Sequence, residues 1–115
     1  MNTPVYDFLI QYAERDPVRL HMPGHKGRFG APALQCATTL DLTEITGADS
    51  LFEAEGILAE SERNAASLYG TAYTFYSCGG STLCIQTMLL LMKQQGRAVL
   101  AARNVHRAFL NTCVL

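Results

Sequence analysis

The segment from Ser81 to Gln95 constrains the fold most, because its apolar residues point in nearly every direction around a helix. A helix with this pattern is covered on all sides in a folded protein. Two short apolar runs, Tyr73–Ser77 and Arg97–Ala102, flank the segment. A strand, a tight turn, a helix and a second strand in this order predict the βαβ unit of a parallel sheet.

The remainder of the 115 residues offers few elements that could cover such a helix. Two parallel strands also do not form a stable open sheet, because parallel sheets are normally buried on both faces. The sequence therefore predicts an α/β fold of which this chain is the front part. A further helix is expected to begin near His106.

The turn before this helix, Gly79-Gly80-Ser81-Thr82, is the first candidate site. Glycines allow a ligand to approach the backbone closely, and the free N–H groups at a helix N-terminus favour an anion such as phosphate. The turn matches neither the P-loop pattern nor the dinucleotide pattern GxGxxG. A simple helix cap by Ser81 after a glycine turn is the alternative interpretation.

His106 follows the second predicted strand, so it is expected at the same sheet edge as the glycine turn. An imidazole at this place can stack on a flat ring or move a proton. The alternative is a structural histidine that caps the next helix.

The loop His21-Met-Pro-Gly-His-Lys-Gly27 is a second candidate region. His21 and His25 have the spacing of a helical metal pair, but Pro23 and Gly24 between them make a helix improbable, and no carboxylate or cysteine nearby completes a metal set. Two histidines and Lys26 in one compact loop indicate part of an active-site wall, and a solvated polar loop is the alternative.

Two amphipathic helices are expected, at Pro4–Arg15 and at Ile57–Tyr69, the second ended by Gly70. Residues 28–39 show little periodicity and are expected to be irregular. Residues 40–45 alternate between apolar and polar, as in a short strand or extended segment. Asp41 and Glu44 would then face opposite sides, which argues against an acid–base pair.

Composition excludes several classes of function. The net charge of −1 gives no electrostatic case for nucleic acid or an anionic membrane, and the longest apolar run is far too short to span a bilayer. The N-terminus does not resemble a signal peptide, so a cytoplasmic location is the default expectation. Widely spaced cysteines without a CxxC pair indicate reduced, mostly buried thiols and no metal site, at Cys36, Cys78, Cys84 and Cys113.

Several blocks together resemble one family in order and approximate spacing. They are His21-Met-Pro-Gly-His-Lys-Gly27, Asp41-Leu-Thr-Glu-Ile45, Leu51-Phe52 with Glu55-Gly56, Leu68-Tyr-Gly70, Gly80-Ser-Thr82 and Arg103-Asn-Val-His106. The chain resembles the N-terminal part of the Orn/Lys/Arg decarboxylases, pyridoxal-phosphate (PLP) enzymes of fold type I, the aspartate-aminotransferase-like fold. It is most similar to the shorter, Gram-positive type without an N-terminal wing domain.

The resemblance implies roles for particular residues. The family's phosphate-binding turn falls on Gly80, Ser81 and Thr82, and the histidine that stacks on the cofactor ring falls on His106. Residues 1–50 would form an N-terminal helix and active-site arm, and residues 51–115 the beginning of the PLP-binding large domain. Blocks near the active site contain further wall residues without assigned roles, namely His21, His25, Lys26, Asp41 and Glu44. The family precedent is a homodimer or higher oligomer.

The chain also departs from the family pattern. Arg107 stands where family members commonly have lysine, and the Schiff-base lysine and the aspartate that pairs with the pyridine nitrogen belong to motifs downstream of Leu115. Neither Lys26 nor Lys93 is a credible substitute, so the chain alone is expected to be inactive.

Three interpretations therefore follow. The chain is an N-terminal fragment of a PLP-dependent arginine, lysine or ornithine decarboxylase, or a non-catalytic remnant or partner that docks on an intact decarboxylase, or an unrelated phosphate or nucleotide binder. The sequence does not choose among the three amino acids.

Overall fold

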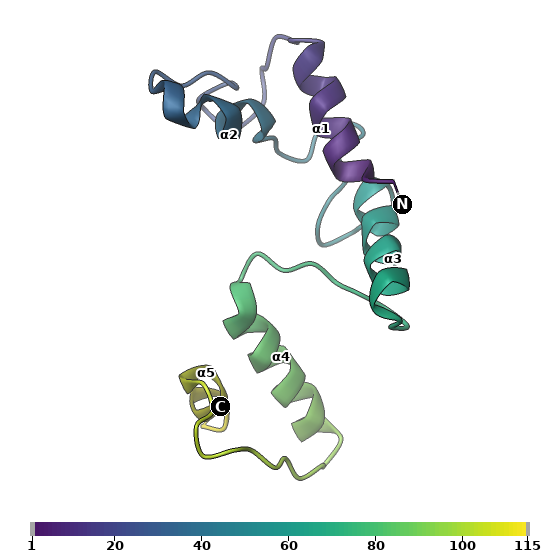
Figure 1. Cartoon of the computed structure of the whole chain (residues 1–115), viewed down its shortest axis with the longest axis vertical. Coiled ribbons are helices and arrows are strands. Elements are labelled where there is room, and N and C mark those ends of the chain that lie inside the picture. The colour runs from purple at the N-terminus through teal and green to yellow at the C-terminus, as the bar shows by residue number, and fades with distance from the viewer. Residues whose placement is uncertain (1, 115) are drawn as a thin grey trace. The chain divides into compact units, whose positions relative to one another are not determined.

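The computed structural model describes residues 2–114 as helices joined by loops (Figure 1). Packing divides the chain between Tyr76 and Ser77 into two units, which are described separately. The first unit contains α1 (Pro4–Glu14), the short 3-10 helix η1 (Pro32–Leu34), α2 (Gln35–Leu40) and α3 (Ile57–Tyr69), and the second contains α4 (Gly80–Gln94) and α5 (Arg107–Thr112). The boundary predicted from the sequence lies at residue 50 instead. It rests on the expected roles of the two parts and stays a prediction.

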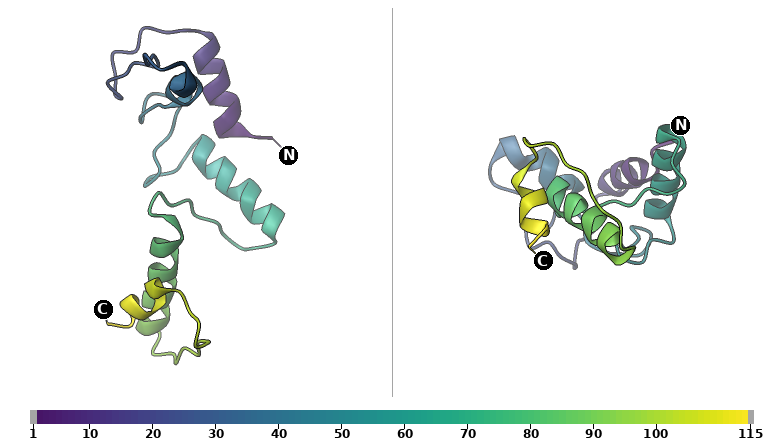
Figure 2. Two further views of the ribbon diagram at one scale, coloured as in Figure 1. Left: turned by 60° about the vertical axis from the view of Figure 1, so that its left-hand side comes forward. Right: turned by 90° about the horizontal axis from the view of Figure 1, so that it is seen from below.

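Helix α1 confirms the first predicted helix and ends at Glu14, one residue before the expected end. Pro4 occupies the first turn, where its missing N–H costs nothing. Thr3 precedes the helix and donates from its hydroxyl to Asp7 Oδ1 at 2.9 Å and from its N–H to Asp7 Oδ2 at 3.3 Å. The helix packs against both α2 and α3 (Figure 2).

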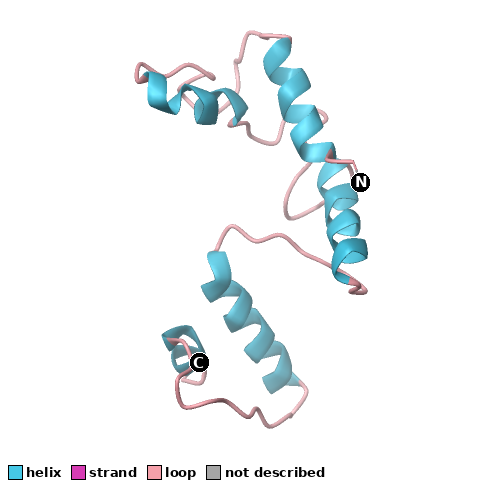
Figure 3. Cartoon of the chain, viewed as in Figure 1, coloured by secondary structure: helices cyan, strands magenta, loops and turns pink. Residues whose placement is uncertain are grey.

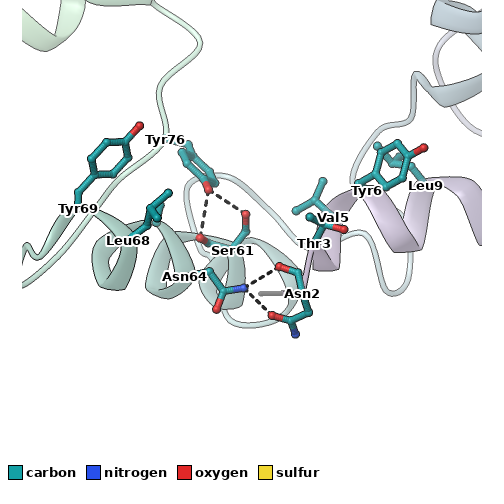
Figure 4. Close-up of a pocket in the computed structure, with 11 residues that line it drawn as sticks. Asn2, Thr3, Val5, Tyr6, Leu9, Ser61, Asn64, Leu68, Tyr69 and Tyr76 are labelled. Carbon is teal, nitrogen blue, oxygen red and sulfur yellow. Dashed lines mark hydrogen bonds between the residues drawn. The ribbon is translucent and has the colours of Figure 1, made fainter.

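Helix α3 spans the range expected from its sequence, and Gly70 ends it in the left-handed conformation with φ +65°. A hollow of about 520 Å³ lies between α1 and α3. Figure 4 shows two polar links at this hollow, in which Asn64 donates to both oxygens of Asn2 and the Tyr76 hydroxyl donates to Ser61 O at 3.1 Å. These bonds connect Asn2, which precedes α1, and Tyr76, which follows α3, to α3 itself.

In the second unit, α5 packs on α4. Leu89 on α4 is 8% exposed and is the buried large apolar residue of this unit, and Ala108 and Thr112 of α5 are buried as well. The Thr112 hydroxyl donates to Ala108 O at 2.6 Å, so its burial leaves no unpaired polar group. The core of the second unit is therefore small.

The two predicted strands are not confirmed. Tyr73–Ser77 and Arg97–Ala102 are loops, and no strand occurs among residues 2–114 (Figure 3). The first segment keeps the alternation of a strand, since the rings of Tyr73 and Phe75 stack with centroids 6.4 Å apart. A strand requires a neighbour to complete its backbone hydrogen bonds, and the described residues supply none. The sheet remains an expectation.

The prediction of an irregular connection at residues 28–39 is wrong, because η1 and most of α2 lie in this range. Leu40 ends α2, and residues 41–45 form no strand. Side-chain bonds hold the six-residue α2, since Gln35 donates to Thr39 Oγ1 at 2.9 Å and Thr39 donates back to Gln35 O at 2.8 Å. Sequence periodicity does not detect a helix held in this way.

Much apolar surface is exposed. On α4, Leu83, Met88 and Leu91 are 45%, 53% and 51% exposed, as expected for a helix that is apolar all round and packed on one side only. No helix within residues 2–114 is long and apolar enough to cross a membrane.

The prediction of mostly buried thiols is also wrong. All four cysteines are free and exposed, namely Cys36, Cys78, Cys84 and Cys113. Their exposure follows from the limited core, because a small apolar side chain is buried only where other elements cover it.

Candidate functional site

The first group of candidate residues lies in the loop from His21 to Gly27, which forms no helix, as expected. His25 Nε2 lies 3.1 Å from Asp41 Oδ2, so the structure brings together two candidate residues that are sixteen positions apart. The His25 side chain is 18% exposed and that of Asp41 is 56% exposed. The other ring nitrogen, His25 Nδ1, accepts from the N–H of Gly27 at 3.1 Å.

Gly27 is the centre of this loop's contacts. It is buried, with φ +74°, and Arg19 lies directly over it. Gln35 of α2 donates to Gly27 O at 2.9 Å. Arg19 in turn donates to Thr39 O at 2.7 Å, and its guanidinium lies over the Tyr12 ring at 5.2 Å from the centroid. The loop, α2 and α1 thus form one connected block.

His21 contacts α1 rather than α2. Its Nε2 lies 2.7 Å from the Tyr12 hydroxyl, and its Nδ1 bonds to the backbone oxygen of Met22. The Lys26 ammonium donates to the backbone oxygen of His21, and Lys26 has φ +53°. Both histidines and the lysine therefore make hydrogen bonds within the loop's own surroundings, which argues against the interpretation as a freely solvated loop.

Asp41 and Glu44 have separate partners. Asp41 bonds to His25, whereas Glu44 Oε1 accepts from the Ser50 hydroxyl at 2.8 Å. Both residues line one open hollow of about 440 Å³, together with Phe8 on α1. The carboxylates are not paired with one another, which agrees with the argument from their spacing although the segment is not a strand.

Asp49 forms a site that the sequence reading missed. Its carboxylate accepts four backbone N–H bonds between 2.9 and 3.1 Å, from Ser50, Glu55, Gly56 and Leu58. The bond from Glu55 has the largest effect, and together these bonds lower the Asp49 pKa from 3.8 to about 2. The carboxylate closes the loop before α3 and satisfies N–H groups at the start of that helix. The sequence signal available for this site was an aspartate seven residues before Gly56, the N-cap of α3.

The second group of candidate residues lies in the second unit. Gly80, Ser81 and Thr82 form the first turn of α4, all exposed, and Gly80 has φ +64°. Among residues 2–114, no side chain caps this helix. The first N–H groups of a helix have no partner within it, so this turn offers backbone donors to a ligand. The alternative interpretation, a cap by Ser81, is not what the structure shows.

His106 is the N-cap of α5. Its Nδ1 accepts from the N–H of Ala108 at 3.2 Å, so the structural alternative for this residue is observed. The cap uses one ring nitrogen and fixes the plane of the ring. Because His106 is exposed, the ring itself stays accessible. Among residues 77–114, no hydrogen bond connects His106 to the glycine turn.

No metal centre is formed by the described residues, in which no three His, Cys, Asp or Glu side chains are placed to hold an ion. The geometry therefore offers a hydrogen-bonded polar loop in one unit, and a helix N-terminus with an accessible imidazole in the other.

Comparison with known proteins decides the family. The sequence model described as "Orn/Lys/Arg decarboxylase, major domain" matches residues 3–115. The chain belongs to the Orn/Lys/Arg decarboxylase family. This confirms the resemblance drawn from the sequence blocks and implies a fold type I N-terminal part.

Named relatives of this family member are bacterial. It is 32% identical to an arginine decarboxylase of Halalkalibacterium halodurans, with 97% of this chain and 24% of the relative covered. It is 34% identical to the uncharacterized protein YaaO of Bacillus subtilis over 94% of this chain and 24% of that protein. It is 24% identical to the lysine decarboxylase LdcA of Pseudomonas aeruginosa over 97% of this chain and 16% of that protein.

The chain spans about a quarter of the length of the first curated relatives that it matches. No solved structure matches it. The activity and substrates of the full-length decarboxylases are therefore proposals where this chain is concerned.

Sequence reasoning also missed two residues that organise the loop, Tyr12 and Arg19. Tyr12 lies within the helix expected at Pro4–Arg15, and its hydroxyl gives no separate signal in the sequence. Arg19 lies two residues before His21, and its position over Gly27 depends on the absence of a side chain at that glycine.

Proposed function

We propose that this family member is part of a PLP-dependent decarboxylase that acts on arginine, lysine or ornithine. The observation that carries the proposal is the family match over residues 3–115. Relatives named arginine decarboxylase and lysine decarboxylase, each aligned over 97% of this chain, support a basic amino acid as the substrate. The Schiff-base lysine would then lie in the part of the relatives that this chain does not span.

The residues of the glycine turn fit the phosphate of PLP. Gly80, Ser81 and Thr82 are exposed at the start of a 15-residue helix, and no side chain among residues 2–114 occupies their N–H groups. A Cβ at Gly80 would meet no heavy atom within 4 Å, so the space beside the backbone is open. Backbone donors and the positive end of the helix dipole favour a phosphate at this place.

His106 fits a stacking role. Its cap bond to Ala108 holds the imidazole in one orientation and leaves the exposed ring for contact with a flat ligand. PLP supplies an electron sink for the carbanion that remains when an amino acid loses CO2. His106 would support that ring by stacking, while the turn would anchor the phosphate.

The His21–Gly27 loop and the segment from Asp41 to Glu44 would form an active-site wall. His21, His25 and Lys26 make hydrogen bonds that fix the loop, and Asp41 and Glu44 line one hollow. The family precedent of a homodimer or higher oligomer, a cytoplasmic location and the absence of nucleic acid or membrane partners complete the proposal.

The test is a decarboxylation assay on the protein from its native source, purified with PLP and characterised by intact mass. A species heavier than 12.6 kDa that releases CO2 from one of the three amino acids, and not from glutamate, supports the proposal. A heavier species that binds PLP and releases no CO2 from arginine, lysine or ornithine contradicts it.

The exposed apolar residues of α4 favour a second candidate function, a non-catalytic partner that docks on an intact decarboxylase. Co-purification of the 12.6 kDa chain with a full-length family member supports this candidate. A soluble monomer of 12.6 kDa without such a partner contradicts it. The third interpretation, an unrelated phosphate or nucleotide binder, is not retained, because the family is shown.

A further inference from the structure

The partners of His25 determine which ring nitrogen carries the proton. The backbone N–H of Gly27 only donates, and it lies 3.1 Å from His25 Nδ1. The Asp41 carboxylate only accepts, and it lies 3.1 Å from His25 Nε2. A neutral imidazole has one donor and one acceptor nitrogen, so the proton of His25 is on Nε2.

The partners of His21 require the opposite arrangement. The backbone oxygen of Met22 only accepts, and it bonds to His21 Nδ1. The proton of a neutral His21 is therefore on Nδ1, and Nε2 accepts from the Tyr12 hydroxyl at 2.7 Å. The Tyr12 ring meets the His21 ring edge-on, with centroids 6.0 Å apart, so ring packing holds the same geometry.

We infer that His21 and His25 are held in opposite tautomers and are positioning residues of the loop, not acid–base groups. Each has both ring nitrogens in hydrogen bonds with this chain's own atoms, which leaves no nitrogen for a substrate proton. The assignment of the His21–Gly27 loop to an active-site wall rests on the proposed function, whereas the tautomers rest on the hydrogen bonds alone.

The two histidines also explain how the loop keeps its shape. His21 connects the loop to α1 through Tyr12, and His25 connects it to the segment after α2 through Asp41. The bond from Gly27 N–H to His25 joins positions i and i+2, as in an Asx-turn, with an imidazole nitrogen in place of the asparagine oxygen. Gly27 closes this turn in the left-handed conformation and lies under Arg19.

The tautomers are measured on the 115-residue chain labelled with ¹⁵N-histidine, from long-range ring correlations at a pH where the imidazoles are neutral. We expect Nδ1–H for His21 and Nε2–H for His25. His106 serves as an internal reference with Nε2–H, because its Nδ1 accepts from Ala108 N–H. Free neutral histidine favours Nε2–H, so the Nδ1–H form of His21 is the sharper marker.

One matched pair of variants tests His21. Tyr12→Phe keeps the ring and removes the hydroxyl, and is expected to shift the His21 Nε2 resonance, while the bond to Met22 O keeps the proton on Nδ1. Tyr6→Phe is the control, because Tyr6 lies on the same helix and is 59% exposed. An unchanged His21 spectrum in Tyr12→Phe overturns the assignment for His21.

A second pair tests His25 through the exchange rate of the Gly27 amide. In His25→Asn the side-chain oxygen can still accept from Gly27 N–H, whereas in His25→Gln the amide reaches toward Asp41 and the Gly27 bond is lost. We expect exchange at Gly27 to be roughly threefold to tenfold faster in His25→Gln than in His25→Asn, the effect of one net hydrogen bond.

Equal exchange rates in the two variants, or an Nδ1–H form of His25 in the unsubstituted chain, overturn the inference for His25. The experiment contains no cofactor, so its failure is distinguishable from failure of the proposed function. A chain that shows both tautomers and binds no PLP would retain this inference and contradict the cofactor proposal. A chain with the spectrum of free histidine at all three positions would refute the inference.

Discussion

Replacing Gly27 with alanine tests the contact that organises the His21–Gly27 loop. A Cβ at this position would lie 2.5 Å from Arg19 Cζ, and the backbone has φ +74°. The left-handed conformation costs an alanine about 1 to 2 kcal/mol. Arg19 would have to move, losing its bond to Thr39 O, worth about 1 kcal/mol at this partly exposed site, and its contact with Tyr12, worth about 0.5 to 1 kcal/mol. The total is about 3 kcal/mol in the free energy of unfolding.

Gly70→Ala is the matched control, because Gly70 has φ +65° and a Cβ there would meet no heavy atom within 4 Å. It is expected to cost only the conformational part, about 1 to 2 kcal/mol. Both variants are compared by urea unfolding with far-ultraviolet circular dichroism, since the chain has no tryptophan. In an Arg19→Ala background the cost of Gly27→Ala is expected to fall to that of Gly70→Ala. Equal costs of the two glycine substitutions in the unsubstituted chain would refute the Arg19 contact.

Two further predictions concern Asp49 and Leu89. The Asp49 pKa of about 2 lies below its unfolded value of 3.8, so the stability contributed by Asp49 is fully present above pH 3.8 and is lost as the pH falls through about 2. Asp49→Asn is expected to flatten this part of an acid unfolding curve, whereas Glu53→Gln leaves it unchanged. Leu89→Ala is expected to destabilise the second unit by about 2 kcal/mol, the low end for a buried leucine because its surroundings are open. Leu100→Ala, at a fully exposed position, is expected to change urea unfolding by less than about 0.5 kcal/mol, and equal effects at Leu89 and Leu100 would contradict the assigned core.

The elements that the sequence predicted correctly carry strong local signals. Helix α1 has Pro4 in its first turn and a regular apolar stripe, and α3 ends at a glycine in the left-handed conformation. The helix after the glycine turn was also expected, and it begins at Gly80 rather than at Ser81. Local propensity therefore determined these elements, together with the glycine cap at the end of α3.

The elements that the sequence did not predict depend on contacts between distant positions. Helix α2 is held by Gln35, whose bonds reach Gly27 and Thr39. The two predicted strands need neighbours for their backbone hydrogen bonds, and none is present among residues 2–114.

The candidate site was predictable by residue type and not by geometry. The histidines, Lys26 and Asp41 were identified from motifs, but the pairing of His25 with Asp41 spans sixteen residues and has no local signal. The four N–H bonds to Asp49 likewise arise from the shape of the loop before α3.

The most direct test of the central claim is a PLP titration of the chain and of two His106 variants. His106→Asn keeps an acceptor for the Ala108 N–H and removes the ring, whereas His106→Phe keeps a ring and removes the cap. We expect PLP to bind more tightly than a simple phosphate ester, and His106→Asn to abolish that difference while His106→Phe largely retains it. Equal affinities for PLP and the phosphate ester in the unsubstituted chain would contradict the cofactor site.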